Sequence, residues 1–424
     1  MDYLPRVVDD ELDELLSGLA AVCLDGPKGV GKTATAQRRA RTVLALDEAE
    51  QRQLLAADPA RLERGETPIL VDEWQRLPEV WDRVRRSVDK DPSPGRFLLT
   101  GSATPKLDAP THSGAGRIVS MRMRPLSLPE RGMVEPSVSV RELLTGTRPQ
   151  VDGATDVDLT EYTHEILASG FPGIRPLPDR ARRAQLDGYL ARVVERDFPQ
   201  QGHPVRRAAT LSAWLAAYAA ATSTTVAYST ILNAATPGEA DKPAKTTVTA
   251  YRDVLTQLWL LDPVPGWTPS RSPFARLQQA PKHHLADPAL AARLLGASPD
   301  SLLGGSRPGP VIPRDGSLLG SLFESLAALT MRVAAQAAEA SVWHLRTSTG
   351  AHEVDFIIER ADHRVVAVEV KLAPTVEDSD VRHLHWLADQ LGGDLLDSVI
   401  VTTGRHAYRR PDGIAVVPLA LLGP

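Results

Sequence analysis

Hydrophobic positions in the first third of the chain alternate between helical spacing and short continuous runs. Residues 2–18 place leucines at three- and four-residue intervals, which predicts a short amphipathic helix. Four continuous runs predict buried strands: Ala20–Leu24, Thr42–Leu46, Ile69–Val71 and Phe97–Leu99. Because helical stretches separate these strands, we expect a parallel sheet covered by helices on both faces.

The rest of the chain falls into three parts. Residues 135–160 are polar and rich in turn formers, so we predict a linker between an N-terminal domain, 1–134, and the remainder of the chain. Residues 161–310 have mostly helical spacing. Residues 311–424 combine a long apolar helix with strands, two of which form a predicted hairpin, Val354–Lys371. The expected fold class is therefore α/β multidomain.

Amino-acid composition restricts the class of protein only slightly. With 424 residues, 42% hydrophobic and 24% charged, the chain is expected to form about three ordinary globular domains. A net charge of −5 gives no overall attraction to nucleic acid or to anionic membranes. One cysteine, Cys23, allows no internal disulfide, and the acidic start has no secretion signal, so we expect a cytoplasmic protein. The uncharged stretch Leu211–Ala235 is rich in Ala, Ser and Thr, and no membrane span is expected there.

A phosphate-binding motif follows the first predicted strand. Its residues, which satisfy G-x-x-x-x-G-K-[ST], are Gly26, Pro27, Lys28, Gly29, Val30, Gly31, Lys32 and Thr33. Glycines let backbone N–H groups surround phosphate oxygens, and the following helix start adds partial positive charge. We predict that Lys32 reaches the β- and γ-phosphates of ATP and that the Thr33 hydroxyl binds Mg²⁺.

Polar residues at the ends of two later strands complete the predicted ATP site. Asp72 is expected to join the Mg²⁺ shell, and Glu73 to act as the base that polarises the attacking water. Thr100 and Ser102 are candidates to sense the γ-phosphate, with a structural capping role as the alternative. Arg117 is a candidate arginine finger, acting in its own subunit or on a neighbour; an ordinary surface arginine is the alternative.

The chain resembles prokaryotic AAA-type ATP-binding proteins that carry a C-terminal domain of unknown function with a restriction-endonuclease-like end. The resemblance rests on the two ATP motifs and on several further stretches of this sequence. These are LLTGSAT at 98–104, RPLSLPE at 124–130, Ser169–Pro172, YLARVVERDF at 189–198, Pro281–Asp287, Gly320–Glu324 and HEVDFII…VVAVEVK. It implies ATP hydrolysis, a winged helix within residues 205–265 and a nuclease-like fold over 311–424.

The C-terminal hairpin brings carboxylates together. If it closes on Asp362, Asp355 lies opposite Glu369, and two carboxylates at that distance repel each other unless a cation lies between them. Lys371 shares a strand face with Glu369. With Glu324 on the preceding helix, the set matches the restriction-endonuclease-like pattern, which implies Mg²⁺ on Asp355 and Glu369.

Three hypotheses for function remain open. The first is a Mg²⁺-dependent ATPase that drives a C-terminal module acting on DNA or RNA. The second is a nucleotide-dependent switch, read by a partner protein or by DNA, with an inactive nuclease-like fold. The third leaves the C-terminal hairpin as a structural cap. Oligomerisation is compatible with all three.

Overall fold

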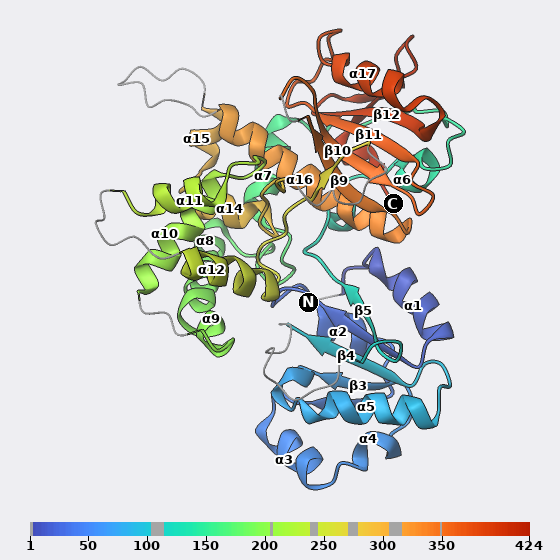
Figure 1. Cartoon of the computed structure of the whole chain (residues 1–424), viewed down its shortest axis with the longest axis vertical. Helices are drawn as coiled ribbons and strands as arrows, with labels where there is room; N and C mark the ends of the chain where they lie inside the picture. The colour runs from blue at the N-terminus through green and yellow to red at the C-terminus, as the bar shows by residue number, and fades with distance from the viewer. Residues whose placement is uncertain are drawn as a thin grey trace.

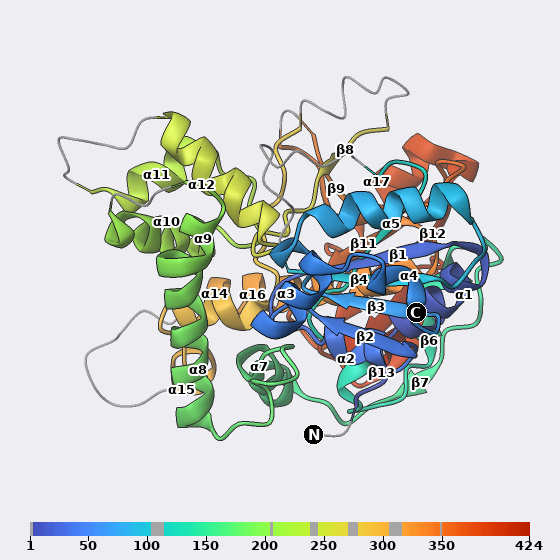
Figure 2. The ribbon, with the colours of Figure 1, turned by 90° about the horizontal axis from the view of Figure 1, so that it is seen from below.

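The computed structural model describes residues 3–102, 114–203, 207–237, 245–269, 279–304, 316–347 and 350–424. Figure 1 shows the N-terminal sheet at one end of the molecule, the C-terminal sheet at the other and a helical lobe beside them. Figure 2, seen from below, shows this lobe projecting to one side of both sheets.

The N-terminal sheet is parallel and has five strands in the order β2-β3-β4-β1-β5. This agrees with the predicted parallel sheet. Because β4 lies between β1 and β3, the carboxyl ends of all three strands meet at one edge. The elements of this part are α1 (Val8–Gly18), β1 (Ala21–Asp25), α2 (Lys32–Gln37), β2 (Thr42–Ala45), α3 (Ala49–Ala57), α4 (Arg61–Arg64), β3 (Ile69–Asp72), α5 (Glu79–Lys90), β4 (Phe97–Gly101) and β5 (Val119–Arg122).

Alternating residues of these strands enter two separate cores. Val22 and Leu98 pack with Leu12 of α1 on one face. Cys23 and Leu99 pack on the other face, in the core that contains residues of α3, α4 and α5. Since both faces are covered, the strands are hydrophobic throughout, which explains the continuous runs in the sequence.

The helical lobe is built mainly from residues 159–303. Its helices are α7 (Leu159–Ala168), α8 (Asp179–Arg192), the π-helix Val193–Asp197, α9 (Phe198–Gln200), α10 (Ala208–Ala220), α11 (Tyr228–Ala235), α12 (Lys245–Gln257), α14 (Pro288–Leu294) and α15 (Pro299–Leu303). After α12, isolated bridges pair Leu261 with Leu285 and Val264 with Lys282. In the described residues between α12 and position 265, strand pairing is limited to these isolated bridges, so the winged helix stays a prediction.

The C-terminal sheet has eight strands in the order β7-β13-β14-β12-β11-β10-β9-β8. It lies between the long helix α16 and helix α17, and hydrophobic residues of its two faces belong to different cores. Its elements are β8 (Gly266–Trp267), α16 (Gly316–Ala337), β9 (Ser341–Arg346), β10 (Glu353–Glu359), β11 (Val365–Val370), α17 (Arg382–Leu391), β12 (Leu395–Thr402), β13 (His406–Arg409), β14 (Ala415–Pro418) and β15 (Leu422–Gly423).

The predicted linker, residues 135–160, is instead part of the C-terminal domain. Strand β6 (Val138–Ser139) pairs with β15, and β7 (Gly153–Ala154) pairs with β13 at the edge of the large sheet. Helix α6 (Val140–Leu143) contacts α16. Two-residue strands leave no periodic pattern in the sequence, and their partners lie more than 250 residues away, so polar composition alone suggested a linker.

Helix α16 is long and apolar enough to cross a membrane by length and composition, with a mean hydropathy of 1.4 over Leu318–Ala337. However, 78% of that window is buried inside the structure, where the helix packs against α6, α7, α14 and β9. Its apolar composition is therefore accounted for by packing at the centre of the molecule.

Candidate functional site

The phosphate-binding loop connects β1 to α2 at the carboxyl edge of the N-terminal sheet. Gly31 has a φ of 102°, a left-handed conformation that favours glycine. At Gly26, an added Cβ would lie 2.1 Å from the carbonyl oxygen of Met123. The two glycines are thus required by backbone conformation and by close packing, respectively.

Lys32 is the first residue of α2 and is 4% exposed. Its ammonium donates hydrogen bonds to the carbonyl oxygens of Gly26 (2.8 Å) and Pro27 (2.9 Å). Burial lowers the pKa of Lys32 to about 8, although Glu73, Asp25 and Asp72 favour its charged form. The amine therefore lies inside the loop, where phosphate oxygens would be better partners than neutral carbonyls.

The predicted magnesium ligands are in direct contact. The Thr33 hydroxyl donates to Asp72 Oδ1 at 2.8 Å, and the Thr100 hydroxyl donates to the same oxygen at 2.5 Å. Asp72 and Thr100 are both buried. A hydroxyl beside a carboxylate, next to a phosphate-binding loop, is a donor set that fits Mg²⁺.

Glu73 follows directly and has a left-handed backbone, with φ 54°. Its N–H donates to the Thr100 hydroxyl (3.0 Å), and its carboxylate contacts Ser102 Oγ and Gln75 Nε2. Thr100 of β4 thus fixes the backbone of Glu73, and Ser102 and Gln75 fix its side chain. Thr100 and Ser102 both lie beside the two acids, and their role in sensing phosphate stays a prediction.

Arg6 is a site residue that no sequence motif indicates. Its guanidinium donates to the carbonyl oxygens of Val30 (2.8 Å) and Arg124 (2.7 Å) and to Glu130 Oε1 (3.0 Å). Only 6% of Arg6 is exposed. A single buried side chain thus joins the N-terminal segment, the phosphate-binding loop and the chain after β5.

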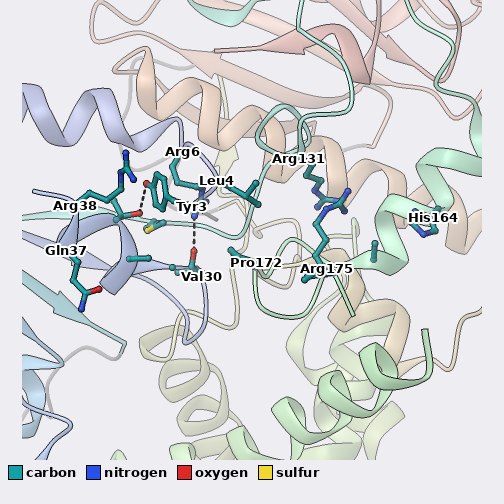
Figure 3. Close-up of a pocket in the computed structure, with 16 residues that line it drawn as sticks. Tyr3, Leu4, Arg6, Val30, Gln37, Arg38, Arg131, His164, Pro172 and Arg175 are labelled. Atoms are coloured by element: carbon teal, nitrogen blue, oxygen red, sulfur yellow. Dashed lines mark hydrogen bonds between the residues drawn. The ribbon is translucent and has the colours of Figure 1, made fainter. Parts of the chain in front are cut away.

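A cavity of about 840 Å³ lies beside the phosphate-binding loop (Figure 3). One side is formed by the N-terminal segment and α2, including Tyr3, Leu4 and Arg38; the other is formed by His164 and Pro172, which belong to the helical lobe. The Arg38 guanidinium lies 4.4 Å from the centre of the Tyr3 ring. The volume is within the range of about 300–1,000 Å³ that is usual for small-molecule sites.

A second cavity of about 460 Å³ lies on another side of the loop. Lys28, whose ammonium pairs with Asp197 at 2.5 Å, lines it from the loop. Three exposed arginines also line this cavity: Arg76, Arg192 and Arg196. None of these three arginines forms an ion pair with another described residue. Positive side chains of two domains therefore surround this edge of the predicted phosphate site.

Arg117 does not lie with the other predicted residues. It precedes β5, whose start pairs with the start of β1, whereas the phosphate-binding loop follows the end of β1. Its side chain is 47% exposed and pairs with Asp89 of α5 at 2.8 Å. Within one chain it is therefore a surface arginine on the opposite edge of the sheet.

The C-terminal hairpin has the predicted register. Phe356 pairs with Val368, and the Arg360 N–H donates to the Arg364 carbonyl, which places Asp355 opposite Glu369. The register between β9 and β10 shifts between Val354 and Ile357, so Asp355 lies in a β-bulge. Bulges re-aim side chains and are frequent beside functional sites.

Four carboxylates meet near this bulge, and we call them the carboxylate cluster: Glu324, Glu353, Asp355 and Glu369. Three of them, Glu324, Glu353 and Asp355, pair with Lys282, which was not predicted as a site residue. Burial, together with the Asp355 charge, raises the pKa of Glu324 to about 8 and that of Glu369 well above its usual value. Burial by itself would raise the pKa of Asp355, but the Lys282 ammonium, the Val370 N–H and Lys371 together outweigh burial and lower that pKa.

The cluster does not match the predicted metal site. Among the described residues, no group of three or more His, Cys, Asp or Glu side chains is arranged to hold a metal ion. The ammonium of Lys282 lies between Glu324 and Asp355, at 2.9 and 3.0 Å. Lys371, as predicted, is near Glu369, with 3.6 Å between Nζ and Oε2.

Comparisons with known protein families divide the chain into three parts. Residues 20–131 match a family described as an AAA domain. Residues 159–301 match a domain of unknown function (DUF8612), and residues 319–422 match another (DUF4143). The N-terminal part of the chain thus resembles an AAA domain, and this match suggests nucleotide binding and ATPase activity.

Two curated relatives resemble nearly the whole chain. One is an uncharacterized protein of Mycobacterium tuberculosis, and the other is an uncharacterized protein of Mycobacterium bovis. Each is 28% identical over 407 residues, which cover 94% of this chain and 79% of the relative. The similarity to these relatives therefore extends beyond the part that matches the AAA domain.

Proposed function

We propose that this protein binds ATP with Mg²⁺ and hydrolyses it. The observation that carries the proposal is the contact of Thr33 with Asp72 directly beside Lys32 and Glu73, at the edge where the phosphate-binding loop begins. In this arrangement Lys32 would bind the β- and γ-phosphates, and Thr33 and Asp72 would hold Mg²⁺, whose charge would offset that of the phosphates. Glu73 positions the attacking water and accepts its proton.

We assign the adenosine part of ATP to the cavity in Figure 3. Its floor includes Gly31 of the loop and Ala34 of α2, so a ligand whose phosphates lie on the loop can extend into it without a break. Apolar side chains such as Leu4 and Pro172 suit a flat base. Because the opposite wall belongs to the helical lobe, bound nucleotide would contact both domains.

A buried ion-pair group supports transmission of the nucleotide state to the C-terminal domain. Asp262 pairs with Arg122 and Arg124, which follow or end β5, and with Arg332 of α16. Arg6 links the same segment to the phosphate-binding loop, since it donates to Arg124 O and Val30 O. A continuous series of polar contacts, which we call the polar route, therefore connects the loop to α16 and would transmit its movement.

This route favours the nucleotide-dependent switch over a nuclease driven by ATP. Helix α16 carries both Arg332 and Glu324, so one rigid element connects the Asp262 group to the carboxylate cluster. A partner protein or nucleic acid that contacts the C-terminal or helical domains would respond to the change in nucleotide state. An Arg117 of a neighbouring subunit remains available as an arginine finger only in an oligomer.

The Lys32→Ala variant tests the nucleotide proposal. Without the buried amine, affinity for ATP in the presence of Mg²⁺ should fall at least about 100-fold, as measured by calorimetry on nucleotide-free protein. Lys90→Ala, an exposed lysine at the end of α5, is the control and should bind like the wild type. Wild-type affinity in Lys32→Ala would refute the assignment of this loop.

A further inference from the structure

Lys282 is one of the most deeply buried charged side chains in the described part of the molecule. Its side chain is 1% exposed, and the ammonium lies 2.9 Å from Glu324, 3.0 Å from Asp355 and 3.4 Å from Glu353. A buried ammonium is costly unless several acceptors surround it. Here three carboxylates from two different elements satisfy it.

The carboxylate oxygens that a divalent metal would need are largely occupied. Asp355 accepts from Lys282 through Oδ1 and from the Val370 N–H (2.9 Å) through Oδ2. Glu324 Oε1 also accepts from Lys282. Among the buried oxygens of the described cluster residues, Glu369 Oε1 has no hydrogen-bond partner. Mg²⁺ or Ca²⁺ needs roughly six oxygen ligands, so a metal bound here would have to displace the Lys282 ammonium from Glu324 and Asp355.

The segment that carries Lys282 is itself fixed by backbone pairing. Lys282 and Val264 exchange both backbone hydrogen bonds at 2.8 Å, and Asp262 N–H donates to His284 O at 2.9 Å. Five residues after Lys282, the Asp287 carboxylate accepts from Gly170 N–H at 2.7 Å. These contacts fix the backbone on both sides of Lys282, while the carboxylates of Glu324 and Asp355 hold its ammonium.

We propose that Lys282 is the resident cation of the carboxylate cluster, in place of a divalent metal. The cluster then acts as a buried ionic link: it fastens the connection between the helical lobe and the C-terminal sheet to α16 and β10. The ionic link requires neither metal nor nucleotide. A result that refutes the link therefore leaves the proposed ATPase activity untouched, and the reverse also holds. It also explains why a nuclease-like arrangement of acids need not cut nucleic acid.

Binding of Mn²⁺ to nucleotide-free, full-length protein tests the proposal directly. Without phosphate oxygens the N-terminal site offers few ligands, so we expect electron paramagnetic resonance to find equal Mn²⁺ binding in the wild type and in Asp355→Asn. A wild-type site that disappears in Asp355→Asn would overturn the proposal. This comparison needs no change at Lys282 and therefore remains decisive if variants there fail to fold.

The Lys282→Met variant adds a gain-of-binding test. Methionine keeps an unbranched chain but leaves three carboxylates without their cation, so the thermal midpoint should fall by about 5–10 °C. Added Mn²⁺ should restore part of the loss, and the double variant Lys282→Met/Asp355→Asn should not respond. Lys90→Met on the surface of α5 is the matched control and should keep the wild-type midpoint. An unchanged midpoint in Lys282→Met would contradict the role as an ionic link.

Discussion

The hydroxyl of Ser102 lies 2.8 and 2.9 Å from the two carboxylate oxygens of Glu73. Gln75 Nε2 adds a contact of 2.6 Å to Oε2. These contacts hold the carboxylate of the proposed base in one orientation. Ser102 therefore acts on Glu73, which gives it a more specific role than sensing phosphate alone.

The Glu73→Gln variant should bind ATP with wild-type affinity and lose at least about 100-fold in kcat. Glutamine keeps the shape of the side chain but cannot accept the proton of the attacking water. Ser102→Ala should lower kcat by roughly tenfold, because the Glu73 carboxylate is still present but loses the hydrogen bond that orients it. Steady-state phosphate release and ATP titration separate the two effects. Equal turnover in Glu73→Gln and wild type would remove Glu73 from catalysis.

Leu4 offers a test of the proposed adenosine cavity. Its side chain lines the cavity and is 42% exposed in the structure. Leu4→Ala should weaken ATP binding by roughly fivefold, because about 1 kcal/mol of apolar contact with the base is lost. Binding of inorganic triphosphate, which needs only the loop, should not change.

A matched control exists for this substitution. Leu54 of α3 is 39% exposed and does not line the cavity. Leu54→Ala should leave both ATP and triphosphate binding unchanged. If Leu4→Ala weakens the two ligands equally, the base lies elsewhere and only the loop assignment survives.

Sequence reasoning succeeded where the interacting residues are close together or repeat a simple pattern. The phosphate-binding loop lies between one strand and one helix, and the register of the Asp355 hairpin follows from its short turn. By contrast, Lys282 lies 42 residues from Glu324 and 73 from Asp355. No sequence periodicity predicts these contacts of Lys282, because they arise only from tertiary packing.

Large separation along the sequence also explains why other contacts were not predicted. Arg6 reaches Glu130 over 124 residues, and Gly153 joins the far edge of a sheet formed mainly after residue 340. Candidate residues at the ends of neighbouring strands, such as Asp72 and Thr100, are in direct contact. The order β2-β3-β4-β1 explains this, since it places the ends of β1, β3 and β4 side by side.

Asp262 provides the test of the route between domains. Burial by itself raises the pKa of this carboxyl, but Arg122, Arg124 and Arg332 outweigh the effect and hold it well below its usual value. A depressed pKa contributes stability above the unfolded value of about 3.9, and this contribution is lost as the pH falls through the folded pKa. The wild type should therefore lose stability steeply below about pH 4.

Asp262→Asn leaves three arginines without their anion and should lower the free energy of unfolding by about 3–5 kcal/mol at pH 7. Because asparagine does not titrate, the variant should also lose less stability than the wild type between pH 4 and pH 2. Urea unfolding at pH 7, 4 and 3 measures both effects. Asp389→Asn, an exposed site on α17, is the control and should follow the wild-type curve. If Asp262→Asn also follows it, the buried ion-pair group does not hold the domains together, and the polar route from the loop to α16 carries no coupling.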